Sequence, residues 1–123
     1  MPGDVRNSIA SDQLLLVDEG LPGSVTFRHL RAPGRRAWFR KTAVSGGFAL
    51  TARRLVVWAG RHKQIDVPLD HPLRREIRID EEEPGRVCFA FELGAFSDKR
   101  SGRMELRCRT AKAARLCELL ATR

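Results

Sequence analysis

The chain has 123 residues, of which 42% are hydrophobic, and a formal net charge of +8 at pH 7. This length and apolar content predict one folded domain and exclude a disordered chain. Even the longest apolar runs, such as residues 55–59, are far too short for a transmembrane helix, which needs about 20 residues. The first residues also lack the apolar core of a signal peptide. The sequence therefore predicts a cytoplasmic protein, peripheral at the membrane if its partner is a lipid.

The charges divide the chain into three parts. Residues 20–65 hold ten Lys or Arg residues and no acid, residues 66–98 hold nine acids and four bases, and residues 99–123 hold eight bases and two acids. A basic face of this kind attracts an anionic partner through its long-range field. An anionic lipid surface, an acidic protein and a nucleic acid all fit this charge, which does not distinguish between them.

Residues 1–20 read as a polar N-terminal lead-in segment. Their apolar cluster, residues 14–17, predicts either a short helix capped by Ser11 or Asp12, or a short strand. Pro22 and Gly23 then form a turn signal that ends the lead-in. We therefore expect the main domain to occupy residues 21–123.

A hairpin at the centre of the chain organises the predicted fold. Residues 48–51 and 55–58 are apolar and strand-like, and a polar turn that Thr51 can start lies between them. Gly46 and Gly47 precede the first strand, where we expect them to allow a kink or bulge.

Six further segments extend this pattern to seven strands and one helix. Alternating apolar residues and Gly or Pro turns predict strands at 24–30, 37–44 (continuing through 48–51), 54–58, 64–69, 75–80, 86–93 and 103–109. In the second strand we expect Phe39 to point inward and Arg40 outward. The period then changes to 3.6, so residues 110–121 predict a helix with Thr110 as its N-cap. Its apolar stripe comprises Ala113, Leu116, Cys117 and Leu120.

This order of elements predicts a mainly β fold: a seven-stranded antiparallel barrel or orthogonal sandwich, capped at one end by the C-terminal helix. The segment Phe48-Ala-Leu-Thr-Ala-Arg-Arg-Leu55 resembles a hairpin of the bacterial pleckstrin-homology and GRAM groups, in which Leu-Thr, a turn, and Arg-Leu or Arg-Ile lead into an apolar strand. Ala52 stands where that turn usually has Asp or Asn, and residues 65–69 are similar to the family's next strand. The resemblance spans about residues 20–122.

The resemblance implies a binding module without enzymatic activity. Its ligands would be a phosphoinositide or other anionic lipid, a peptide or protein partner, or further copies of the chain. In lipid-binding members the ligand lies at the open end of the barrel, in the loops after strands one, three and six. Those loops here carry seven cations: Arg31, Arg35, Arg36, Arg61, Lys63, Lys99 and Arg100. Guanidinium groups suit phosphate oxygens because they bind them in a bidentate fork, and a solvated surface is the alternative for these side chains. Arg53 and Arg54 belong to the opposite end, where we expect them to be structural or exposed.

Nothing in the sequence predicts catalysis, a cofactor or a metal site. The chain has no catalytic sequence motif, and its three histidines lack the spacing of metal ligands. Its three cysteines form no Cys-x-x-Cys pair and are predicted to be reduced and buried. Nucleic-acid binding is the alternative function, since aromatic side chains beside basic ones can stack on bases. The aromatic residues concerned, which we expect in the core because of their strand positions, are Trp38, Phe39 and Trp58.

Overall fold

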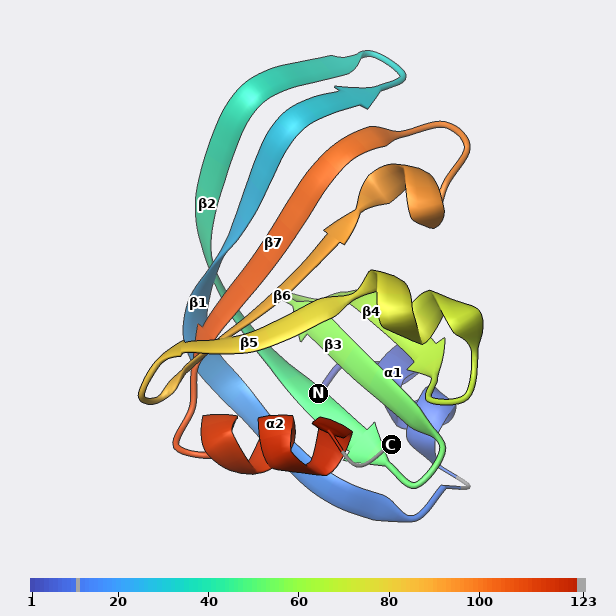
Figure 1. Ribbon diagram of the computed structural model, residues 1–123, viewed down its shortest axis with the longest axis vertical. Coiled ribbons are helices and arrows are strands. Elements are labelled where there is room, and N and C mark those ends of the chain that lie inside the picture. Colours follow the sequence, from blue (N-terminus) through green and yellow to red (C-terminus); the bar gives the residue numbers. More distant parts are fainter. Residues whose placement is uncertain (11, 122–123) are drawn as a thin grey trace.

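The computed structural model describes residues 1–10 and 12–121 (Figure 1). Within them, seven antiparallel strands form one sheet in the order β4-β3-β2-β1-β7-β6-β5, and a helix follows the last strand. The strands are β1 (Leu14–Ala32), β2 (Arg35–Thr51), β3 (Arg54–Ala59), β4 (His62–Pro68), β5 (Arg78–Glu83), β6 (Arg86–Glu92) and β7 (Ser101–Arg109). The helices are α1 (Gly3–Ile9), α2 (Ala113–Ala121) and the 3-10 turns η1 (Pro72–Glu76) and η2 (Leu93–Ala95). The predicted class, mainly β with a C-terminal helix, is confirmed.

The sheet is strongly bent but not closed. β4 and β5 are its two edges and do not pair with each other, so the expected closure into a barrel is wrong at the level of strand pairing. η1 connects these two edges, and two prolines, Pro68 and Pro72, bracket the connection without N–H groups to donate. β5 also begins and ends three residues later than predicted. Glu81 and Glu83, which we expected in a turn, pair with β6.

One core fills the inner face of the bent sheet. Alternate residues of β6 and β7 point into it, as predicted, and pairs such as Phe89 and Leu106 face each other across the two strands. The apolar stripe of α2 completes this core with Leu116 and Leu120 buried. Helix α2 begins at Ala113, later than expected. The Thr110 hydroxyl still accepts a hydrogen bond from the backbone N–H of Lys112 at 3.0 Å.

The N-terminal segment packs on the other face of the sheet. Val5 of α1 is fully buried against Ala49, Val56 and Trp58, which point away from the main core. β1 starts at Leu14, so the strand interpretation of residues 14–17 is correct and the helix interpretation is wrong. β1 also runs through the Pro-Gly pair that we expected to end the lead-in.

The two candidate caps of that rejected helix have different outcomes. Ser11 lies outside the described residues. The Asp12 carboxylate accepts a hydrogen bond from the Thr51 hydroxyl at 3.2 Å and forms an ion pair with Arg54 at 3.4 Å. Asp12 therefore ties the N-terminal segment to the β2–β3 turn instead of capping a helix. Thr51 starts that turn as predicted, because its hydroxyl accepts the backbone N–H groups of Arg53 and Arg54.

Two glycines of β2 serve close packing and do not form a bulge. β2 pairs regularly with β3 through Gly46 and Gly47, and the irregularity lies opposite them in β1, between Asp18 and Leu21. A Cβ atom on Gly47 would collide with the Trp58 ring and lie 2.5 Å from the Asp18 carbonyl oxygen. Gly47 is thus required where the indole packs directly over the backbone.

Candidate anion-binding surface

The β1–β2 hairpin forms one end of the molecule. β1 and β2 pair as far as Ala32 and Arg35, where the turn contains Gly34 in the left-handed region with φ of 71°. β3 pairs with residues 46–50 of β2, and the backbone N–H of Gly60 donates to the Ser45 carbonyl oxygen at 2.6 Å, so the free strand edge comprises residues 35–44. Figure 1 shows the hairpin turn at the top of the view and α2 near the bottom. The exposed end of this hairpin is therefore remote from the helix.

Strand pairing brings five of the seven candidate cations to this end. Arg31 lies opposite Arg36 in β2 and opposite Ser101 in β7, and Ser101 directly follows the η2–β7 loop. The five exposed side chains, which we call the hairpin-end cations, are Arg31, Arg35, Arg36, Lys99 and Arg100.

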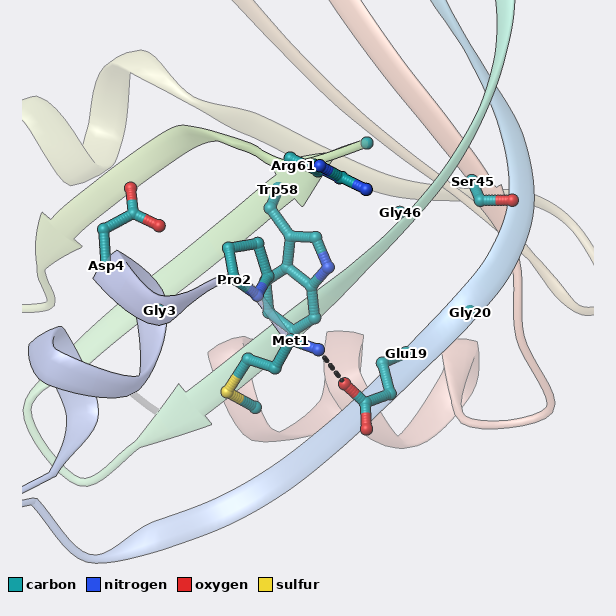
Figure 2. A pocket seen from close by; sticks show the side chains of 11 residues that line it. Met1, Pro2, Gly3, Asp4, Glu19, Gly20, Ser45, Gly46, Trp58 and Arg61 are labelled. Atoms are coloured by element: carbon teal, nitrogen blue, oxygen red, sulfur yellow. Dashed lines mark ion pairs between the residues drawn. The ribbon is translucent and has the colours of Figure 1, made fainter.

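The other two candidates lie elsewhere. The β3–β4 turn begins after Ala59, which lies opposite Gly46 in the sheet. Gly46 is roughly 35 Å along β2 from the hairpin turn, at about 3.3 Å per residue. Arg61 lines a separate pocket of about 650 Å³ beside α1, where the α-amino group of Met1 pairs with Glu19 at 2.8 Å (Figure 2). Lys63 forms an ion pair with Asp66 at 2.9 Å.

Two exposed aromatic residues accompany the hairpin-end cations. Trp38 is 80% exposed and Phe39 is 52% exposed, so the expectation that both belong to the core is wrong, whereas Trp58 is buried as predicted. Cross-strand register explains the difference. Phe39 lies opposite Arg28, whose guanidinium carbon is 5.1 Å from the phenyl centroid. Arg40 lies opposite Phe27, which packs against the core, so the predicted orientations of Phe39 and Arg40 are reversed.

Most other arginines of the sheet are neutralised by carboxylates, in contrast to the hairpin-end cations. Glu105 is buried on the outer face and accepts hydrogen bonds from Arg28 at 3.1 Å, Arg103 at 2.9 Å and Arg107 at 3.1 Å. Arg107 also binds both carboxylate oxygens of Glu82, at 2.8 and 3.2 Å. Across residues 1–10 and 12–121, the five hairpin-end cations have no ion-pair partner.

The pKa shifts follow from these contacts. Burial alone would raise the pKa of the Glu105 carboxyl, but hydrogen bonds from three arginines hold that pKa below its usual value. The hydrogen bond from Arg107 lowers the pKa of Glu82, and it raises the pKa of Arg107 itself. Burial raises the pKa of the Cys88 thiol to about 11 and that of Cys108 to about 12, so both thiols are protonated and unreactive at neutral pH. The pKa shifts of Glu82, Glu105 and Arg107 thus reflect a network of ion pairs on the sheet. The raised pKa values of Cys88 and Cys108 keep these two thiols in their unreactive form.

Sequence reasoning placed Trp38 and Phe39 in the core and so missed them as surface residues. The available signal was their position directly after the acid-free turn, beside five cations. The structure gives this surface an excess of positive charge, with Asp98 as the acid of the η2–β7 loop, together with exposed aromatic rings. Such a surface can bind anions and partly apolar partners at once.

Comparisons with protein-family models, curated proteins and solved structures gave no match for this chain. Among the described residues, no helix is both long enough and apolar enough to cross a membrane.

Proposed function

We propose that this chain is a non-enzymatic pleckstrin-homology-like binding module whose β1–β2 hairpin end binds an anionic lipid surface. One observation carries the proposal: five exposed cations, none of which forms an ion pair within the part of the chain that the structure describes, lie at the same end of the hairpin as the exposed rings of Trp38 and Phe39. The strand order with a C-terminal helix, and the hairpin of residues 48–55, support the pleckstrin-homology-like interpretation. The protein would be cytoplasmic and peripheral at the membrane.

The surface suits the boundary between water and lipid headgroups. Indole and phenyl rings partition into this boundary, while Arg and Lys contact the phosphates beside them. Each cation near an anionic surface contributes about 1 kcal/mol to binding at physiological ionic strength. The five hairpin-end cations therefore supply several kcal/mol, and the aromatic rings add to this.

Edge protection is a structural explanation for part of this surface. Charged residues on a free strand edge prevent association with other strands, and the edge of β2 carries Arg35 and Arg36. This explanation does not extend to Trp38 and Phe39, because exposed aromatic rings promote association. A binding partner accounts for both the charges and the rings.

Nucleic acid is the second candidate, favoured specifically by the exposed face of Trp38, on which a base could stack. Proteins that bind single strands place several aromatic platforms along a charged groove. Here Trp38 and Phe39 are consecutive residues of β2, so their rings project from opposite faces near the end of the hairpin and do not line one groove. A protein partner or a second copy of the chain would use the free edge of residues 35–44 instead.

The test is co-sedimentation with vesicles of phosphatidylcholine alone and of phosphatidylcholine with phosphatidylserine. The test variants are Arg35→Ala/Arg36→Ala and Trp38→Ala. The matched control, Arg53→Ala/Arg61→Ala, removes the same charge from exposed positions away from the hairpin end. We expect the wild type and the control to bind only the anionic vesicles and both test variants to bind much more weakly.

Two further measurements separate the alternatives. Binding of a fluorescent single-stranded oligonucleotide without vesicle binding would replace the lipid proposal by the nucleic-acid function. Sedimentation velocity would reveal self-association that depends on Trp38. Equal loss of vesicle binding in the control and in the Arg35/Arg36 variant would show that net charge alone is responsible, and the proposed surface would then be wrong.

A further inference from the structure

A second basic feature lies on the outer face of the sheet, with no residue in common with the hairpin-end cations. It is a pocket of about 350 Å³ where β2, β1, β7 and β6 run side by side. Small residues of β1 and β2, among them Gly23, Ser24 and Ala43, form its floor. Its four charged residues are all cations: Lys41, Arg86, Arg107 and Arg109.

Strand register explains why a hollow forms here. Ser24 lies opposite Ala43 on one side and opposite Arg107 on the other. Next to it, Gly23 lies opposite Cys108, and a Cβ atom on Gly23 would collide with the Arg107 carbonyl oxygen. β1 and β7 therefore approach closely with only small side chains between the long cationic ones. These small side chains cannot fill the space above the strands.

Carboxylates outside the pocket lining form ion pairs with three of its cations. Arg107 is fixed by Glu82 and Glu105, and Arg109 binds Glu83 at 3.1 Å. Arg86 approaches Glu83 at 3.4 Å. None of these glutamates lines the pocket itself. The Arg107 side chain, 15% exposed and held by two glutamates, loses little conformational freedom when it binds a ligand, so it is the preorganised cation of the pocket.

The pocket keeps excess positive charge despite these ion pairs. The network contains five arginines and three glutamates: Arg28, Arg86, Arg103, Arg107 and Arg109 with Glu82, Glu83 and Glu105. Lys41 adds a further charge from β2, and among the described residues it has no ion-pair partner. The charge that remains points to an anionic ligand.

We propose that this pocket binds the phosphoryl group of a phosphomonoester. Guanidinium groups and an ammonium group on opposite walls suit the several oxygens of a phosphate, and the Ser24 hydroxyl can donate a further hydrogen bond. The volume lies within the range of small-molecule sites and exceeds that of a single phosphate ion. A phosphorylated small molecule or a phosphorylated lipid headgroup satisfies these requirements.

Isothermal titration calorimetry at low ionic strength tests the site, with inorganic phosphate and glucose 6-phosphate as probes. We expect Lys41→Ala to weaken binding about tenfold, as loss of a charged hydrogen bond does. Ala43→Leu keeps every charge but occupies the floor, so it should abolish binding. Arg53→Ala is the matched control: it removes one exposed cation away from the pocket and should bind like the wild type.

A third arm uses vesicles containing a phosphatidylinositol monophosphate. If Lys41→Ala and Ala43→Leu weaken binding to these vesicles alone, the phosphate belongs to a lipid headgroup. If they weaken binding of the soluble probes, it belongs to a free ester. The proposal is overturned if no probe binds. It is equally overturned if Ala43→Leu binds normally or if Arg53→Ala is as weak as Lys41→Ala, because binding would then be diffuse charge attraction.

Discussion

Replacement of Glu105 by glutamine tests whether the outer-face ion pairs stabilise the sheet. Only 8% of the Glu105 side chain is exposed, and its two oxygens accept hydrogen bonds from three arginines of β1 and β7. Glutamine has nearly the same shape but no charge, and its NH2 group is a donor that would face another donor. At least one guanidinium group would therefore lose its acceptor.

The expected cost is about 2 kcal/mol of the free energy of unfolding. A hydrogen bond to a charged group contributes about 1.5–3 kcal/mol. The sum over three bonds must be discounted because the side chains of Arg28 and Arg103 are 45% and 39% exposed and regain water. Arg107 retains its contacts with Glu82. For a chain of this size, about 2 kcal/mol lowers the melting temperature by roughly 8 °C.

The same network predicts the direction of acid destabilisation. The folded state holds the pKa of Glu105 below its ordinary value of 4.5, so the unfolded chain binds the proton more readily. The ionised Glu105 carboxylate therefore makes its full contribution to the free energy of unfolding above its ordinary pKa. This contribution is lost as the pH falls through the lowered pKa of the folded state. Glu82 acts in the same direction but is more exposed. The difference in melting temperature between the wild type and Glu105→Gln should become smaller as the pH falls below 4.5.

Thermal unfolding followed by circular dichroism between pH 7 and pH 3 measures both effects. Glu118→Gln is the control, because Glu118 forms an exposed ion pair with Arg115 on α2 and should change stability by less than about 0.5 kcal/mol. If Glu105→Gln were as stable as this control at pH 7, the reasoning that the buried network stabilises the sheet would be refuted.

Three further predictions concern packing, the β2–β3 turn and the thiols. Gly47→Ala should lower the free energy of unfolding by about 1–3 kcal/mol, because a Cβ atom at this position has no space. Gly3→Ala should not lower it, because nothing lies within 4 Å of the added Cβ atom. Equal stability of the two variants in thermal unfolding would contradict the packing argument. Thr51→Ala should cost about 1–2 kcal/mol because two backbone N–H groups lose their acceptor, and full recovery in Thr51→Ser would show that the hydroxyl is responsible. Cys88 and Cys108 should react with a thiol reagent at pH 8 only after denaturation. Rapid labelling of all three thiols in the native protein would contradict the burial of Cys88 and Cys108.

The core-facing residues of β6 were predictable from sequence. Val87, Phe89 and Phe91 share one face of the strand and all three lie in the core, and Cys88 and Ala90 on the other face are buried too. A period of two identifies the core-facing residues because their face is uniformly apolar. The stripe of α2 was predictable for the same reason with a period of 3.6. The seven-residue helix α1 was not, because it has no side-chain cap and only its packing on the sheet stabilises it.

The orientation of β2 was not predictable, because alternation defines two faces without saying which is inside. Of the neighbours Phe39 and Arg40, the apolar residue was expected to point into the core. The register with β1 decides otherwise, since Phe27 is the buried member of its pair and faces Arg40. Register depends on turn position and on the whole ladder, and these are not local properties of the segment.

Strand lengths explain why the candidate site was only partly predictable. The loops after strands one, three and six were expected at one end because lipid-binding members of the family that the chain resembles place them there. β1 and β2 have 19 and 17 residues, whereas β3 has 6 and β4 has 7. The β1–β2 turn therefore extends far beyond the β3–β4 turn, which separates Arg61 from the hairpin-end cations.

The division of charge along the sequence has a direct structural consequence. The acidic middle of the chain forms β5, and its Glu82 and Glu83 neutralise arginines of β6 and β7. β1 and β2 lie on the far side of β7 from these acids, and residues 20–51 of their hairpin contain none of their own. Among the described residues, Glu105 of β7 is the carboxylate that pairs with this part of the hairpin away from the β2–β3 turn, and it binds Arg28. The carboxylates are thus used within the sheet, and the positive charge that gives the chain its net excess is left concentrated at the hairpin end, where the exposed rings of β2 also lie.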